Sequence, residues 1–233
     1  MPTLTSGARR SGGLAFIVAG FAWAVWFYLE SAPPRLGFDD TDDPAVSLRF
    51  LHEHATVYAQ AGLAFIVLAI ALVVGVLAVA ELLASRAGSV AVRATTTFGL
   101  FSAVFFLGHA AIRMSAGPIL HIDSLDHDWG EAAYIAVQMV GTHLMAEGGL
   151  LALSLWAAAV AVLGWRTRAI PRWLCLLTVL PSLRLVAVLG PLGLGDGPDV
   201  IWLAFMASIL GTGVWFVLFG LALLRRPPGV ATA

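Results

Sequence analysis

The segment GTHLMAEGG, residues 141–149, places two ionisable side chains inside a stretch of sequence that is otherwise apolar. His143 and Glu147 are four residues apart, so in an α-helix they share a face and lie one turn from each other. An imidazole beside a carboxylate can transfer protons, with Glu147 as donor or base and His143, or alternatively His109, as its partner. Because ionisable groups are costly inside a membrane, they are candidates for function by default. These two residues are therefore the candidate catalytic pair.

A second histidine with a similar setting suggests a cofactor site. His109 and His143 each have a glycine within two residues. If they lie on adjacent helices, their imidazoles can ligate haem iron from its two sides, and glycine lets the flat macrocycle approach the backbone. Arg113 is four residues from His109 and could hold a haem propionate. We therefore expect haem b as a candidate cofactor, with Arg184 as a further charged group at the site.

The same residues allow two other interpretations. His109, His143 and Glu147 resemble a two-histidine, one-carboxylate set and could bind a transition-metal ion instead of haem. No CxxCH or HExxH motif supports either cofactor. The alternative is a structural ion pair, because an unpaired Arg or Glu in lipid costs at least about 2.5 kcal/mol. On that ground we expect Glu147 to lie near Arg184 or His109.

The elements that must position these residues are membrane helices. The 233-residue chain is 60% hydrophobic and 12% charged, whereas soluble domains average about 45–50% apolar and about 25% charged residues. Its mean hydropathy is +0.90. A spanning helix needs about 20 apolar residues, so we predict an all-α, polytopic membrane bundle of six transmembrane helices that forms a single domain. The predicted spans are residues 12–30, 57–84, 96–116, 132–163, 173–190 and 199–224.

The charges between these spans predict the orientation of the bundle. Nine arginines fall on the side that holds both ends of the chain, whereas the opposite loops are rich in Asp and Glu. By the positive-inside rule, both termini are cytoplasmic and the protein is a multi-pass protein of the inner (plasma) membrane, with an uncleaved first helix. The nine are Arg9, Arg10, Arg86, Arg93, Arg166, Arg168, Arg172, Arg225 and Arg226.

Each of the three predicted outer loops ends in a signal that starts a helix. Pro44 in DDPAV and Pro198 in GPDV suit the first turn of a helix. Asp128 and Glu131 in DWGE have the spacing of a capping box. We expect helices to begin at all three places, and a short helix at the outer surface within residues 44–59, ahead of the second span.

Two stretches carry a resemblance to a known family. RAIPRWLCLLTVLPSLRLVAVLGPLG opens the fifth predicted span with Ile170-Pro171-Arg172-Trp173-Leu174, and RRSGGLAFIVAGF opens the first. Together with the six-span layout, they resemble the bacterial membrane family labelled domain of unknown function 4386. The resemblance implies a six-helix bundle and no particular activity. The histidines are not part of the pattern of that family.

Composition narrows the partners, and three functions stay open. The net charge of −1 argues against a nucleic-acid partner, and the single Cys175 allows neither an internal disulfide nor a CxxC motif. The bilayer is the expected surrounding. In the first, the protein is a redox membrane protein, an oxidoreductase that binds haem or a metal ion at a buried polar site in the outer half of the membrane. Alternatively, it is an intramembrane enzyme acting on a lipid or isoprenoid by acid/base chemistry, or a structural or accessory subunit of a membrane complex.

Overall fold

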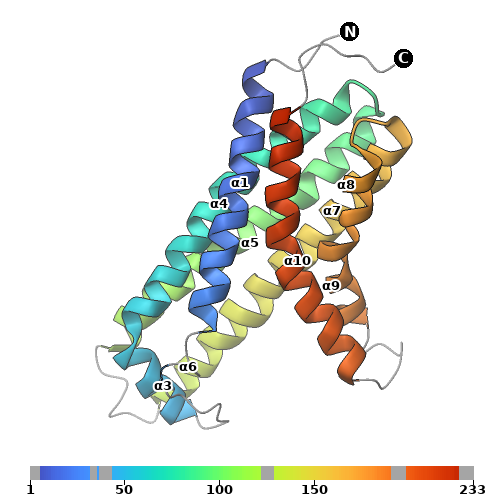
Figure 1. Cartoon of the computed structure of the whole chain (residues 1–233). Coiled ribbons are helices and arrows are strands. Elements are labelled where there is room, and N and C mark those ends of the chain that lie inside the picture. Colours follow the sequence, from blue (N-terminus) through green and yellow to red (C-terminus); the bar gives the residue numbers. More distant parts are fainter. Residues whose placement is uncertain (1–5, 32–35, 37–43, 122–128, 190–197, 226–233) are drawn as a thin grey trace.

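The protein is an elongated bundle of helices that run up and down its long axis (Figure 1). The computed structural model describes residues 6–31, 36, 44–121, 129–189 and 198–225. Every regular element within these ranges is helical, so the predicted all-α class is confirmed. The first residues of α1 (Ser6–Glu30) and the last residues of α10 (Pro198–Arg225) lie at the same end of the bundle.

Within the described ranges, five helical stretches are long and apolar enough to cross a membrane, which indicates an integral membrane protein. They lie in α1, in α4 (Ala55–Ala84), in α5 (Ser89–His121), in the continuous segment of α6 (Trp129–Gln138), η1 (Met139–Ala146) and α7 (Glu147–Thr167), and in α10. All of them coincide with predicted spans. The candidate spans themselves are Gly7–Glu30, Ala55–Ala84, Ser89–Ser115, Ala132–Thr167 and Ile201–Arg225.

The remaining predicted span, residues 173–190, is interrupted. It forms α8 (Arg172–Leu177) and α9 (Val179–Leu189), and each is shorter than the stretches above. Pro181 has no backbone N–H to bond the carbonyl one turn earlier, which weakens the helix at this point. Neighbouring helices hold the break: Trp215 Nε1 of α10 donates to Thr178 Oγ1 (3.1 Å), and Ser154 Oγ of α7 donates to the Pro181 carbonyl (2.7 Å).

The predicted helix starts agree with the structure. α3 (Pro44–Glu53) begins at Pro44, α10 begins at Pro198, and α6 begins one residue after Asp128. The short helix expected within residues 44–59 is α3, which ends where the backbone turns at His54 into α4. Asp128 itself, the acidic stretch 39–43 and the rest of loop 122–128 lie outside the described residues.

Glycine brings α1 and α10 into backbone contact. A Cβ at Gly220 would lie 2.5 Å from the Gly13 carbonyl oxygen, and one at Gly20 would lie 2.9 Å from the Gly213 carbonyl oxygen. In both helices the two glycines are seven residues apart, so they share a face. Small residues at helix contacts allow this approach in membranes, where van der Waals packing replaces the hydrophobic effect as the source of helix association. Aromatic rings around Phe16, which contacts rings of α7 and α10, fill the neighbouring core.

Candidate functional site

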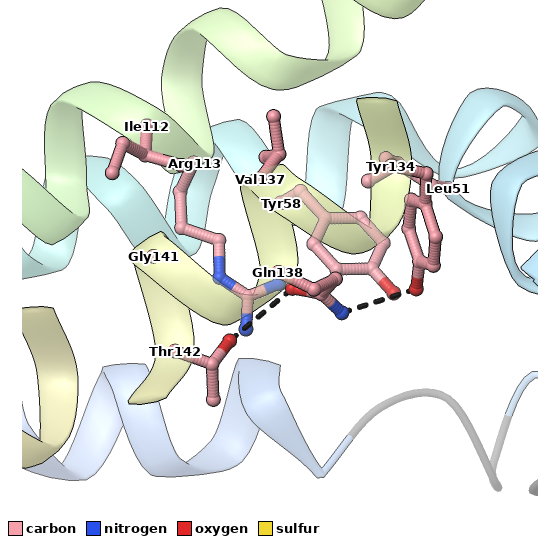
Figure 2. Close-up of a pocket in the computed structure, with 9 residues that line it drawn as sticks. All are labelled: Leu51, Tyr58, Ile112, Arg113, Tyr134, Val137, Gln138, Gly141 and Thr142. Atoms are coloured by element: carbon pink, nitrogen blue, oxygen red, sulfur yellow. Dashed lines mark hydrogen bonds between the residues drawn. The ribbon is translucent and has the colours of Figure 1, made fainter. Parts of the chain in front are cut away.

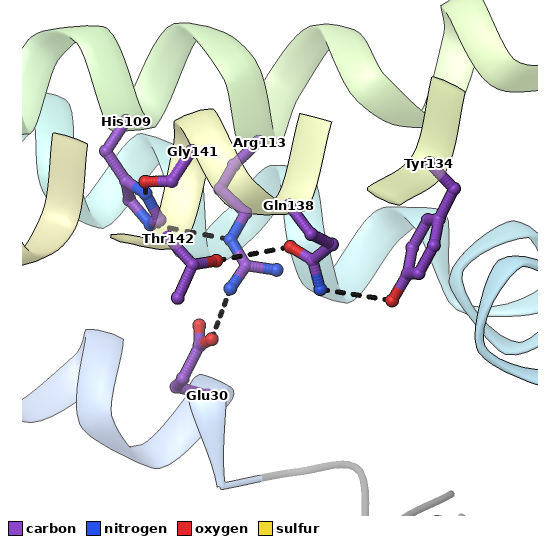
Figure 3. Close-up of polar contacts among 7 residues, drawn as sticks. All are labelled: Glu30, His109, Arg113, Tyr134, Gln138, Gly141 and Thr142. Carbon is purple, nitrogen blue, oxygen red and sulfur yellow. Dashed lines mark hydrogen bonds and ion pairs between the residues drawn. The ribbon is translucent and has the colours of Figure 1, made fainter. Parts of the chain in front are cut away.

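His109 of α5 belongs to a polar cluster in which Arg113 lies between it and Glu30 (Figure 3). Its side chain is only 2% exposed. Nδ1 lies 2.6 Å from the carbonyl oxygen of Gly141, and Nε2 lies 3.4 Å from Nε of Arg113. A carbonyl can only accept, so Nδ1 carries the proton, and Nε2 accepts from the guanidinium. Neutral His109 in this tautomer has partners at both ring nitrogens.

Arg113 joins this histidine to the end of α1. Its Nη2 forms an ion pair with Oε1 of Glu30, and its guanidinium lies 5.1 Å from the centroid of the Tyr58 ring. Arg113 is 9% exposed, whereas the carboxylate side chain of Glu30 is 35% exposed. Residues 109 and 113 lie one turn apart and share a face of α5, as their spacing predicts. A continuous chain of hydrogen bonds thus runs from α1 through α5 to η1.

A second row of polar groups follows α6 into η1. Gln138 Nε2 donates to the Tyr134 hydroxyl (3.0 Å), and Thr142 Oγ1 donates to Gln138 Oε1 (3.2 Å). The three residues are spaced four apart, which places them on one helical face. Figure 2 shows this row beside Arg113 and Tyr58 in the wall of one pocket.

Two adjoining cavities open between these rows. The first, of about 20 Å³, is bounded by α3, α4, α5, α6 and η1, and the second, of about 90 Å³, extends to the end of α1. Both have Tyr58, Arg113 and Gln138 in their walls. Apolar side chains such as Leu51 and Val57 complete the lining. Since about 10–15 Å³ suffices for one water molecule, the second cavity has room for a small polar group.

The backbone of η1 explains why Gly141 reaches the cluster. Residues 139–146 are π-helical, and the N–H of Glu147 bonds the carbonyl of Thr142, five residues earlier. Such segments are rare and occur often at functional sites. Gly141 is buried against α5, where a Cβ would lie 2.9 Å from Cγ2 of Ile112. The absence of a side chain therefore lets its carbonyl meet the His109 ring.

A second ion pair lies where η1 passes into α7. Glu147 Oε2 pairs with Nη2 of Arg184 on α9, which is one of the two partners expected for this carboxylate. Arg184 is 7% exposed, and its guanidinium lies 4.2 Å from the centroid of the Phe205 ring. Its Nε is buried and has no hydrogen-bond partner among the described residues.

The structure does not bring the two histidines together as a ligand pair. His143 is exposed on the surface of η1, whereas both ring nitrogens of His109 are occupied. Gly141 meets the His109 ring through its backbone carbonyl, whereas the side chain of His143 is exposed. Within the described ranges, no three His, Cys, Asp or Glu side chains form a group able to hold a metal ion. The set His109, His143 and Glu147 is thus not assembled, and Arg113 is engaged by Glu30.

Sequence reasoning missed Glu30, Tyr58 and Tyr134. Glu30 looks like a loop residue, because it ends the first apolar segment, and only the packing of α1 against α4 and α5 reveals its partner. Tyr134 gives a usable signal, since Tyr134, Gln138 and Thr142 repeat polar groups every four residues in an apolar segment. This spacing marks a polar helical face.

In comparisons with known proteins, no family model, curated protein or solved structure matches the chain. The resemblance to the family labelled domain of unknown function 4386 therefore stays a prediction. Function has to be argued from the polar cluster itself.

Proposed function

We propose that this protein is a six-span membrane protein with cytoplasmic termini that binds the head group of an uncharged lipid or isoprenoid in the two adjoining cavities. One observation carries the proposal: polar side chains from α4, α5, α6 and η1 converge on a shared space that also has apolar walls. Amphipathic molecules suit such a lining, because small-molecule sites combine an apolar surface with a few placed polar groups. In this topology α8 and α9 together form the sixth crossing.

The lengths of the helices support a place for the cavities at the outer boundary of the hydrocarbon layer. About 20 helical residues cover its thickness of about 30 Å. Counting this length from Arg10 leads to Glu30, and counting it from Arg93 leads to Arg113. These two end points form an ion pair, so the lengths of α1 and α5 independently support the same membrane depth for it. A lipid head group from the outer leaflet lies at this depth.

The charges of the site favour an uncharged head group. Glu30 already neutralises Arg113, so the cavity walls offer hydrogen bonds without a net charge. Arg113 uses two of its five N–H donors in the bonds to His109 and Glu30, which leaves others for an oxygen of a ligand. The hydroxyls of Tyr58 and Tyr134 can donate or accept. A hydroxyl or carbonyl oxygen therefore fits better than a phosphate, which would compete with Glu30 for the guanidinium.

The earlier alternatives have less support from the described residues. Acid/base catalysis would use Glu147 and His143, but Glu147 is engaged by Arg184 and His143 lies on the outer surface of η1. Haem or metal binding would need a ligand set that the histidines do not form. The geometry supports binding, and we assign no reaction to the site.

Lipids that copurify with the full-length protein test this function. We expect mass spectrometry of the extracted lipids to show an uncharged species with a hydroxyl or carbonyl head group, enriched over the membrane average. Gln138→Leu removes an amide from both cavities and should lower this enrichment about tenfold, a loss of about 1.4 kcal/mol. Gln60→Leu is the matched control, because Gln60 is exposed on α4 and does not line either cavity. Equal enrichment in both variants would overturn the proposal.

A further inference from the structure

An apolar groove follows the contact between α1 and α10. Its volume is about 380 Å³, and its lining contains no charged side chain. Gly20, Ala24 and Phe27 form one wall, whereas Leu210, Gly213 and Val214 form the other.

The groove exists because small residues leave space beside a fixed helix contact. The backbones of α1 and α10 touch at Gly20 and Gly213, and Trp23 Nε1 donates to the Ile209 carbonyl (2.7 Å). These contacts hold the two helices at a constant separation. Ala24 is exposed and too short to fill the space between them. A site held open in this way is a preformed feature of the surface.

The groove and the polar cavities lie along the same helix. Phe27 lines the groove, and Glu30 lines the larger cavity three residues further on, which places both on one face of α1. Leu29 also borders that cavity. The cavity and the groove share no lining residue, so a molecule with its head group beside Glu30 would pass Phe27 to enter the groove.

We infer that this groove holds the hydrocarbon chain of the molecule whose uncharged head group the cavities bind. The inference rests on the proposed function and names the ligand class as a single-chain amphiphile such as a prenyl alcohol. Both walls belong to candidate membrane spans, so the chain enters from the surrounding bilayer. Moving a chain from lipid into the groove gains no hydrophobic free energy, because lipid tails are equally apolar. The head group supplies the affinity, and the shape of the groove selects the chain.

Photo-crosslinking of the full-length protein in phosphatidylcholine nanodiscs tests the inference. The probe is geranylgeraniol with a diazirine at the end of its chain. We expect peptide mass spectrometry to find crosslinks in residues 20–27 and 209–218. Ala24→Trp fills the groove and should reduce these crosslinks about tenfold, which corresponds to a loss of about 1.4 kcal/mol in binding free energy. Val25→Trp is the matched control, because Val25 is 50% exposed on the same helix and does not line the groove.

The cavity variant separates failure of this inference from failure of the proposed function. If Gln138→Leu reduces crosslinking but the crosslinks lie away from α1 and α10, the groove assignment is overturned and the head-group site stands. If a geranylgeranyl hydrocarbon without the hydroxyl labels the groove equally well, bulk lipid explains the labelling and the inference also fails. If neither Ala24→Trp nor Gln138→Leu changes the labelling pattern, both proposals are overturned.

Discussion

Among its described residues, the bundle contains two arginine–glutamate pairs with nearly the same local chemistry and very different surroundings. In both pairs the arginine is buried, about a third of the glutamate side chain is exposed, and the guanidinium lies against an aromatic ring. Arg113 also donates to His109 and faces two cavities. Arg184 has a buried Nε without a partner in the described part of the chain.

On this difference we base the proposal of a binding site at the first pair and a structural contact at the second. Glu30 and Arg113 belong to a hydrogen-bonded network that spans three helices and still leaves donors towards a cavity. Glu147 and Arg184 mainly hold α7 against α9, close to the interruption between α8 and α9. An ion pair in a membrane is thus not evidence of function by itself, and the polar groups around it decide its role.

The largest expected effect is on stability, from the isolated pair. Glu147→Gln leaves the charge of Arg184 buried and without a counter-ion, which should lower the free energy of unfolding by about 3 kcal/mol. The double variant Glu147→Gln, Arg184→Met removes the remaining charge and should recover most of this loss. Thermal unfolding in detergent, followed by size-exclusion chromatography, measures both. A double variant no more stable than Glu147→Gln would show that the charge itself is not the cause.

Breaking the pair of Arg113 and Glu30 should have a large effect on lipid binding and a small effect on stability. Arg113→Met should reduce binding of the copurifying lipid by tenfold or more. Hydrogen bonds to a charged group contribute about 1.5–3 kcal/mol, and about 1.4 kcal/mol corresponds to a tenfold change in affinity. The cost of Arg113→Met in unfolding free energy should be smaller than that of Glu147→Gln, because Glu30 is partly exposed at the end of α1 and can be rehydrated. The comparison fails if Arg184→Met reduces lipid binding as strongly as Arg113→Met does.

Substitutions of His109 and His143 should also differ, and the quantity that differs is the free energy of unfolding. His109→Phe removes the acceptor for Arg113 and should lower the unfolding free energy by about 1 kcal/mol, since the new ring can still pack against Phe65, whose centroid lies 4.6 Å from the imidazole. His143→Phe changes an exposed residue and should alter stability by less than about 0.5 kcal/mol. Visible absorption of both purified variants provides a further check. A Soret band that either substitution abolishes would restore the haem hypothesis.

Much of the fold could be predicted because its signals are local. Apolar length marks the five candidate spans, and Pro44 and Pro198 mark helix starts, since proline suits the first turn. The break at Thr178 depends on Pro181 together with hydrogen bonds from α7 and α10. The sequence shows the proline but not the hydrogen bonds from Ser154 and Trp215, so these contacts at the interruption could not be predicted.

The site was predicted in part. The cost of burying charge predicts that Glu147 lies near Arg184 or His109, and the structure has Arg184 as its partner. The four-residue spacing predicts that His109 and Arg113 share a face of α5, where the structure has a hydrogen bond between them. In the structure the ring nitrogens of His109 contact the Gly141 carbonyl and Arg113, whereas His143 is exposed on the π-helical segment η1. No known pattern in the sequence identifies such a segment, and Glu30 is recognisable only from tertiary packing.

The smallest expected effect on lipid binding concerns the row of polar groups in the cavity wall. Tyr134→Phe removes the hydroxyl that accepts from Gln138 and leaves the ring in place, so it should weaken lipid binding only about threefold, a loss below about 1 kcal/mol. If the hydroxyl acts by orienting the amide, Tyr134→Phe should add nothing once Gln138→Leu is present. Lipid binding by the two single variants and the double variant measures this coupling. Fully additive losses would mean that Tyr134 contacts the ligand directly, and that the row contains two independent contacts.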